Sequence, residues 1–185
     1  MKSAYLILIL FLFIGCSSKK DFSNQNKSNN NIPSMIFFND SLLLIKSDKI
    51  ELWKDNAKEF TKNFGSKIST FVKDKGSNVF LGFEDGKILY VKEDKSFDET
   101  ENFFEPIKLL KLSEDFQFLI AVSVNNKIII VDRTTKNMGM GSYDENIVDI
   151  KISGDNRQLS IQFEKKIVIL DFIDKKELGT IQITE

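Results

Sequence analysis

The sequence contains no histidine and only one cysteine, Cys16. Without an imidazole side chain the protein has no histidine general base, no histidine-based catalytic triad and no histidine ligand for zinc. A single cysteine also excludes a disulfide within the chain. The common phosphate-binding patterns G-x-x-x-x-G-K-[ST] and G-x-G-x-x-G do not occur. We therefore expect no enzyme activity, no metal site and no bound cofactor.

Aspartates that recur in predicted turns are the remaining candidates for catalysis, and they are Asp74, Asp85, Asp115 and Asp155. Two of them could in principle form a glycosidase-like pair of carboxylates. Their regular placement has a simpler cause, because an aspartate side chain stabilises a turn by accepting hydrogen bonds from nearby backbone amides. A carboxylate-dependent hydrolase is therefore only a remote alternative.

The charged residues do not favour nucleic acid as a partner. Four of the 26 basic residues and one of the 27 acidic residues precede Pro33, so residues 33–185 carry 22 basic and 26 acidic residues, a net charge of −4. Nucleic-acid binding usually requires a patch of basic residues. The lysines here are spread along the region and form no such patch. We expect no nucleic-acid partner.

The N-terminus combines Lys2, an apolar run from Ala4 to Ile14, and the small residue Gly15 directly before Cys16. This pattern indicates a secretory signal, and the 12 residues from Ala4 to Gly15 are too few for a span, which needs about 20. It resembles the bacterial lipoprotein signal, and its relaxed form, with Phe13 in place of the usual leucine, resembles spirochaetal lipoproteins. The resemblance implies a signal peptide at residues 1–15, cleavage before Cys16, and a diacylglycerol thioether on the Cys16 thiol.

Residues 16–32 are predicted to be the lipidated cysteine followed by a flexible polar tether, since Ser17–Asn31 has one aromatic residue and no packed face. A multiply acylated cysteine should not leave the membrane. We therefore place the protein in the cell envelope, anchored by lipid on the periplasmic side or on the outer surface of an outer membrane. Residues 33–185 have the length of a single domain.

A Lys-Ile pair that opens a short apolar strand occurs four times in this domain, at Lys49, Lys87, Lys127 and Lys166, which are separated by 38, 40 and 39 residues. Each strand follows a turn, of which Asp85-Gly86 and Asn125-Asn126 suit tight hairpins. A second register of strands, at residues 68–73, 107–112 and 147–152, repeats at 39 and 40 residues. The spacing predicts an all-β domain of four antiparallel repeats, each with four strands and about 40 residues.

These repeats resemble WD40-type β-propeller blades in a degenerate form. The family's Trp-Asp dipeptide becomes Trp53-Lys54, Val91-Lys92, Val131-Asp132 and Leu170-Asp171, and its Gly-His signature is absent with histidine itself. The repeats could close into a four-bladed ring, form an open arc, or complete a larger ring with a second copy. An irregular antiparallel β-sandwich is the alternative fold.

We predict a non-catalytic protein-binding or scaffold module that contacts other envelope proteins and can self-associate. A surface-exposed lipoprotein that contacts host molecules is the alternative. Trp53 and Tyr90 lie within predicted strands and are expected to pack in the core. Phe97, Phe103 and Phe104 flank the acidic segment Asp98–Glu101, and they are the candidate partner-binding residues.

Overall fold

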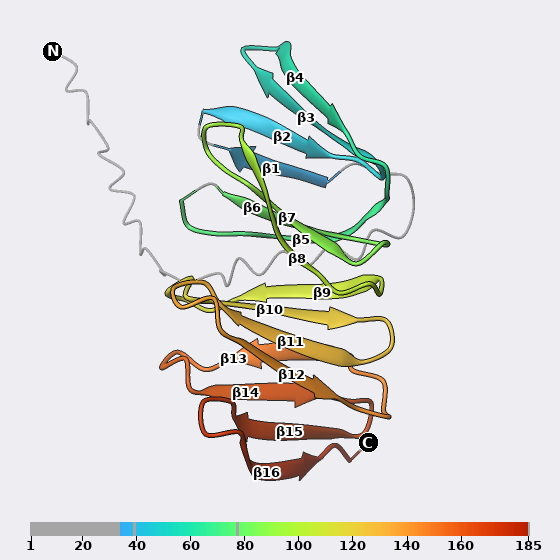
Figure 1. Cartoon of the computed structure of the whole chain (residues 1–185), viewed down its shortest axis with the longest axis vertical. Coiled ribbons are helices and arrows are strands. Elements are labelled where there is room, and N and C mark those ends of the chain that lie inside the picture. The colour runs from blue at the N-terminus through green and yellow to red at the C-terminus, as the bar shows by residue number, and fades with distance from the viewer. Residues whose placement is uncertain (1–33, 39, 77, 185) are drawn as a thin grey trace, which may run out of the picture.

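The computed structural model describes residues 34–184 except positions 39 and 77, and it gives no side-chain placement for residues 100 and 101. Within these residues the chain forms sixteen strands and no helix, in four sheets of four strands each (Figure 1). The first sheet contains β1 (Ser34–Phe38), β2 (Ser41–Ile45), β3 (Lys49–Lys54) and β4 (Ala57–Asn63). The second sheet contains β5 (Ile68–Lys73), β6 (Val79–Phe83), β7 (Lys87–Val91) and β8 (Phe97–Asn102). The third sheet contains β9 (Ile107–Leu112), β10 (Phe118–Ser123), β11 (Lys127–Asp132) and β12 (Met138–Ser142). The fourth sheet contains β13 (Asp149–Ile152), β14 (Gln158–Gln162), β15 (Lys166–Asp171) and β16 (Lys176–Gln182).

Each sheet is an antiparallel meander whose strands follow chain order, so each predicted repeat is one sheet. The four Lys-Ile pairs open the third strand of every sheet, as the spacing predicts. The turns before these strands also behave as expected. Gly86 has a φ of 88° and Asn126 a φ of 61°, in the left-handed region that glycine and asparagine tolerate. The all-β prediction and the four repeats are thus confirmed.

Three apolar clusters hold the four sheets together. The first joins the first and second sheets through residues such as Leu43 and Leu81, and the next joins the second and third sheets around Phe80 and Leu119. The last cluster joins the third and fourth sheets, with Ile120 among its fully buried members. Every inner sheet is therefore apolar on both faces, because it packs against a neighbour on each side.

The sheets follow one another along the long axis and do not close into a ring (Figure 1). Strand β9 contacts β5 on one side and β13 on the other, so the first strands of these sheets line up on one side of the stack. The fourth strands β4, β8, β12 and β16 lie at the opposite edges of their sheets. Of the three arrangements predicted, the closed four-bladed ring is therefore wrong, the described chain has the open form, and a larger ring with a second copy stays a prediction. The sheets do not form the alternative β-sandwich.

The predicted signal peptide, Cys16 and the tether at residues 16–32 lie outside the described residues. In the part of the chain that the structure describes, no helix has the length and apolar character needed to cross a membrane.

Candidate functional site

The side chains of the recurring aspartates accept hydrogen bonds within the turns in which they lie. Asp115 Oδ1 accepts hydrogen bonds from the Ser113 hydroxyl, at 2.6 Å, and from the Gln117 amide, at 2.9 Å. Asp155 makes the same two contacts with Ser153 and Arg157. The hydrogen bond from Ser113 is the main reason that the pKa of Asp115 lies below its usual value.

The other two recurring aspartates follow the same rule. Asp74 Oδ1 accepts the amide hydrogens of Gly76 and Asn78, and Asp85 Oδ1 accepts that of Lys87. The described residues also contain no group of three or more acidic or cysteine side chains that could hold a metal ion. These carboxylates act as turn residues, as the simpler sequence interpretation predicts.

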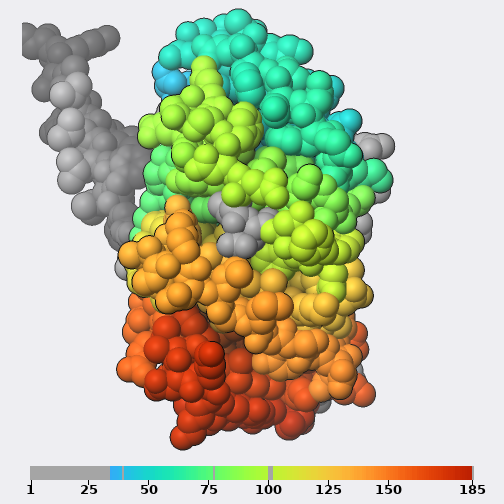
Figure 2. Space-filling model, in the orientation of Figure 1, coloured from blue at the N-terminus to red at the C-terminus, as the bar shows by residue number. Residues whose placement is uncertain are grey.

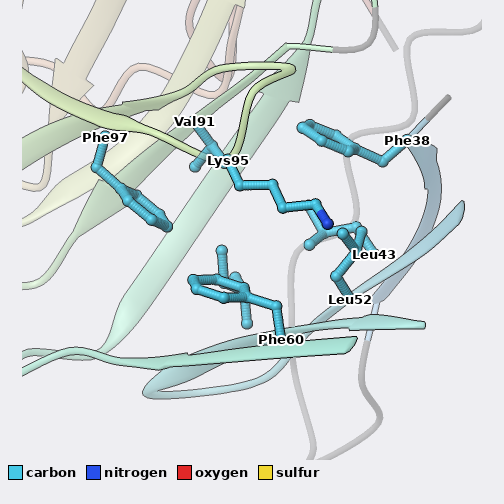
Figure 3. A pocket seen from close by; sticks show the side chains of 8 residues that line it. Phe38, Leu43, Leu52, Phe60, Val91, Lys95 and Phe97 are labelled. Carbon is cyan, nitrogen blue, oxygen red and sulfur yellow. The ribbon is translucent and has the colours of Figure 1, made fainter. Parts of the chain in front are cut away.

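A small cavity lies at the junction of the first two sheets and has about 210 Å³ of empty space, including its open mouth. Figure 3 shows Lys95 extending across the cavity, away from Phe97 and toward Leu43 and Phe38. The Lys95 ammonium group lies 3.0 Å from a carboxylate oxygen of Glu59. Sites for small molecules usually have about 300–1,000 Å³ and carry several polar groups. This cavity is smaller and lies along the seam between the first two sheets.

The three phenylalanines chosen from the sequence lie in different environments. Phe97 is half-buried and packs on the rings of Phe60 and Phe64, with centroids 6.0 and 6.2 Å away. Phe103 is half-buried against the cluster between the second and third sheets. Phe104 is 85% exposed. Only Phe104 therefore offers its ring to a partner, and binding by these residues stays a prediction.

A larger apolar surface lies on the side of the first sheet that faces away from the second sheet, and we call it the outward face. It consists of Met35, Phe37, Leu42, Leu44 and Trp53, which are brought together by the strand register: Met35 lies opposite Leu44, and Leu42 lies opposite both Phe37 and Trp53. Met35 is 65% exposed and Phe37 is 75% exposed. Contiguous apolar surface of this kind marks an interaction site more often than scattered apolar residues do.

The outward face carries the residues that the other sheets bury. The second strand of each sheet has an aliphatic residue at one equivalent position, which pairs with the residue four places after the repeat lysine. These aliphatic residues are Leu42, Val79, Leu119 and Leu159. In the second to fourth sheets these side chains are at most 1% exposed, because each packs against the preceding sheet. Among the described residues no sheet precedes the first one, so no described sheet covers its matching face.

One acidic residue interrupts this face. Glu51 is only 4% exposed, and its carboxylate accepts a 2.7 Å hydrogen bond from Lys46 and a 3.4 Å bond from the indole of Trp53. The hydrogen bond from Lys46 outweighs the cost of burial and holds the pKa of Glu51 below its usual value. Lys49 lies 3.7 Å from the same carboxylate, and Lys58 lies 5.9 Å from the centre of the Trp53 ring. The outward face therefore has an apolar centre and a rim of lysines.

Sequence reasoning placed Trp53 in the core, and this was wrong. Trp53 is half-buried on the outward face, whereas Tyr90 stacks on Phe80 at 4.5 Å as expected for a core residue. Strand β3 has Leu52 on the covered side of the sheet and Trp53 on the uncovered side. Because both residues are apolar, alternation could not show which side another sheet covers.

No model of a known protein family matches the chain, and no curated protein matches it. Solved structures do match its fold. One is apo AztD from Citrobacter koseri, with a TM-score of 0.58 and 15% identity over 80% of this chain and 46% of the other. Another is BBS1N in complex with ARL6DN, with a TM-score of 0.63 and 9% identity over 81% of this chain and 51% of the other. The chain therefore has a propeller-like fold, and it spans about half the length of these two structures.

Proposed function

We propose that this protein is a membrane-anchored lipoprotein that acts as a non-catalytic protein-binding or scaffold module in the bacterial cell envelope. The observation that carries the binding role is the uncovered outward face of the first sheet. Met35, Phe37 and Trp53 supply the large apolar side chains that dominate binding energy at protein interfaces. Lysines at its rim would set the orientation of a partner and favour an acidic one.

The anchoring role rests on Cys16 and on its distance from the first sheet. Seventeen residues separate Cys16 from Ser34, the first residue of β1. A flexible chain of this length spans about 23 Å on average. Lipid on Cys16 would therefore hold the outward face within reach of the membrane surface and of proteins embedded there, which raises its effective concentration toward them.

A surface-exposed lipoprotein that contacts host molecules is the second candidate, and Phe104 favours it. This ring is 85% exposed, and its backbone has a φ of 56° in the turn that follows β8. An exposed phenylalanine on a tight turn is a suitable anchor for a partner. Removal of the domain by protease treatment of intact cells would support this location, and full protection would exclude it.

The binding role is tested by placing a photo-crosslinking residue at Phe37 in living cells. We expect irradiation to link the protein to one or a few defined envelope proteins. Ile181, which is 54% exposed on β16, is the matched control at the opposite end of the stack, and it should give much less product. Equal labelling from the two positions, or no product from Phe37, would reject the outward face as the binding site.

The anchor is tested separately with Cys16→Ala in the full chain. We expect this variant to lose labelling by radioactive fatty acid and to lose retention in the membrane fraction, while its β-sheet circular dichroism stays unchanged. The reason is that the lipid, and no part of the described domain, holds the protein at the membrane. Membrane retention without acylation would overturn the lipoprotein proposal.

A further inference from the structure

The fourth strand of each sheet ends the sheet on its outer side, and one of these four edges differs from the rest. Strands at free edges usually carry charged residues, which discourage pairing with another chain. Lysine or acidic residues are present in β4, β8 and β16, for example Lys58, Asp98 and Lys176. Strand β12 reads Met-Gly-Met-Gly-Ser and carries no charge. Its edge therefore lacks the usual protection.

The hydrogen bonds between β11 and β12 show which backbone groups of β12 point away from the sheet. The Tyr143 amide bonds the Asn126 carbonyl at 3.2 Å, and the Asp132 amide bonds the Asn137 carbonyl at 2.9 Å. In an antiparallel ladder, hydrogen-bonded pairs alternate with pairs that are not bonded to each other. The register then directs the N–H and C=O groups of Met138, Met140 and Ser142 away from β11.

The side chains of β12 leave this edge accessible. Met138 is 55% exposed and Met140 is 74% exposed, both on the same side of the strand. A Cβ atom added at Gly139 would meet no atom within 4 Å, and one at Gly141 would meet only the Tyr143 ring, at 3.8 Å. Neither glycine has the positive φ that would require it. Packing within this chain therefore does not explain the two glycines.

We propose that two copies of this protein pair through β12, antiparallel and around a two-fold axis, to form a continuous eight-stranded sheet. Met140 of one copy then lies opposite Met140 of the other, and Met138 lies opposite Ser142. All three residues donate and accept backbone hydrogen bonds across the junction. Figure 2 shows that the orange residues around position 140 lie on the surface of the third sheet that faces the viewer.

The composition of β12 fits such self-pairing better than that of any other outer edge. Two-fold pairing places the central residue of the strand opposite the same residue of the other copy. A charge near the centre of the strand therefore lies next to a like charge. In β8 this would bring the acidic residues of two copies together. In β12 it joins two flexible methionines, which adapt their shape to each other, and the glycines leave the other side of the junction free of steric conflict.

Disulfide crosslinking in the full chain tests both the partner and the register, because Cys16 is the only natural cysteine. We expect Met140→Cys to give a disulfide-linked dimer on a non-reducing gel, since Cα atoms of directly opposite residues lie about 5.5 Å apart. Thr61→Cys on β4 and Thr180→Cys on β16 are the matched controls with outward-directed backbone groups, and they should remain monomeric. Wild-type protein sets the background from Cys16, so a dimer there would instead report that Cys16 is free and would count against the proposed lipid anchor.

Coexpression then tests the register itself. Met138→Cys and Ser142→Cys should form a linked heterodimer with each other and little linked homodimer alone. Adding Met140→Lys to both chains should abolish that product, whereas Met140→Leu should preserve it. A dimer from Met140→Cys no more abundant than from the two controls would overturn the proposal. A product of Met140→Cys with a different protein in place of a second copy would overturn it as well.

Discussion

The first and fourth sheets are built from the same repeat but end the stack in different ways. The two central positions of the second strand that face away from the stack are occupied by Leu42 and Leu44 in the first sheet and by Ser160 and Gln162 in the fourth. The second strand of the fourth sheet is thus polar on its outward side, as the terminal units of stacked repeats often are, although Ile167, Ile169 and Ile181 lie on the same face. The second strand of the first sheet carries leucines in place of these polar residues, and this difference favours the outward face as an interaction surface.

The same two sheets also make one equivalent side-chain contact with different residues. In three of the four sheets the residue before the second strand contacts the residue five positions after the repeat lysine. Arg157 bonds Asp171 at 3.2 Å in the fourth sheet, while Asp40 bonds Lys54 in the first sheet with the charges exchanged. In the third sheet the pair is Gln117 and Asp132, at 3.3 Å. Three of the four sheets therefore keep this contact with different residue pairs.

The largest expected effect on stability comes from shortening the side chain at one equivalent strand position in the first and fourth sheets. Ile161 in β14 and Leu44 in β2 occupy matching positions, but Ile161 is fully buried against the third sheet. We expect Ile161→Ala to lower the free energy of unfolding by about 2–5 kcal/mol, because it leaves a cavity. Leu44→Ala should cost about 1 kcal/mol, since Leu44 is only half-buried. Urea denaturation measures both.

Leu81→Ala in the second sheet is the internal control for this pair, because Leu81 is also fully buried at the matching position. It should behave like Ile161→Ala. If Leu44→Ala were as destabilising as the other two variants, the outward face would be covered in the isolated protein, and the contrast between the two ends would be wrong.

Strand positions could be predicted from the sequence, because the Lys-Ile pairs recur at almost constant spacing and the turns contain residues suited to positive φ. Among the fourth strands, β4 and β16 could be predicted, whereas the acidic β8 and the glycine-rich β12 were not located because they carry little apolar alternation. The predicted strand at residues 147–152 begins in the structure at Asp149, as Ile147 is buried before the strand starts.

The candidate surfaces could not be predicted in the same way. The second strands of the second and third sheets are apolar on both faces and buried throughout, as in Val79–Phe83. The sequence of β2 looks much the same, so only the absence of a preceding sheet makes its second face available. Phe97 was chosen as a candidate partner-binding residue because acidic residues follow it, and its ring turns toward Phe60 on the neighbouring sheet. Both features depend on packing between sheets, which local patterns do not encode.

A second prediction makes the outward side of the second strand apolar in the fourth sheet, as it is in the first sheet. Ser160→Ile combined with Gln162→Val installs the residues that the third sheet carries at these positions, Ile120 and Val122. The free energy of unfolding should change by no more than about 0.5 kcal/mol, because these side chains lie at the uncovered end. Light scattering should show larger species than for the wild type that grow with concentration.

These species should be open-ended, since one end of the stack would bind the other end of the next molecule. Adding Phe37→Ser to the double variant should suppress them, while adding Phe104→Ser should not. If the double variant behaved like the wild type, or if Phe37→Ser had no effect on its assembly, the outward face would not be the adhesive surface.

The smallest effect concerns Glu51, whose place in the fourth sheet is taken by Val168. The hydrogen bond from Lys46 lowers the pKa of Glu51 in the folded protein below the ordinary value of 4.5, so the folded state favours the ionised carboxylate. The stability that this provides is complete above the pKa of the unfolded chain and is lost as the pH falls through the lower folded pKa. Unfolding free energies of the wild type and of Glu51→Gln should therefore differ more at pH 7 than at pH 3. All other carboxylates are common to the two chains, so the difference isolates Glu51, and parallel pH profiles would show that its pairing with Lys46 contributes nothing to the outward face.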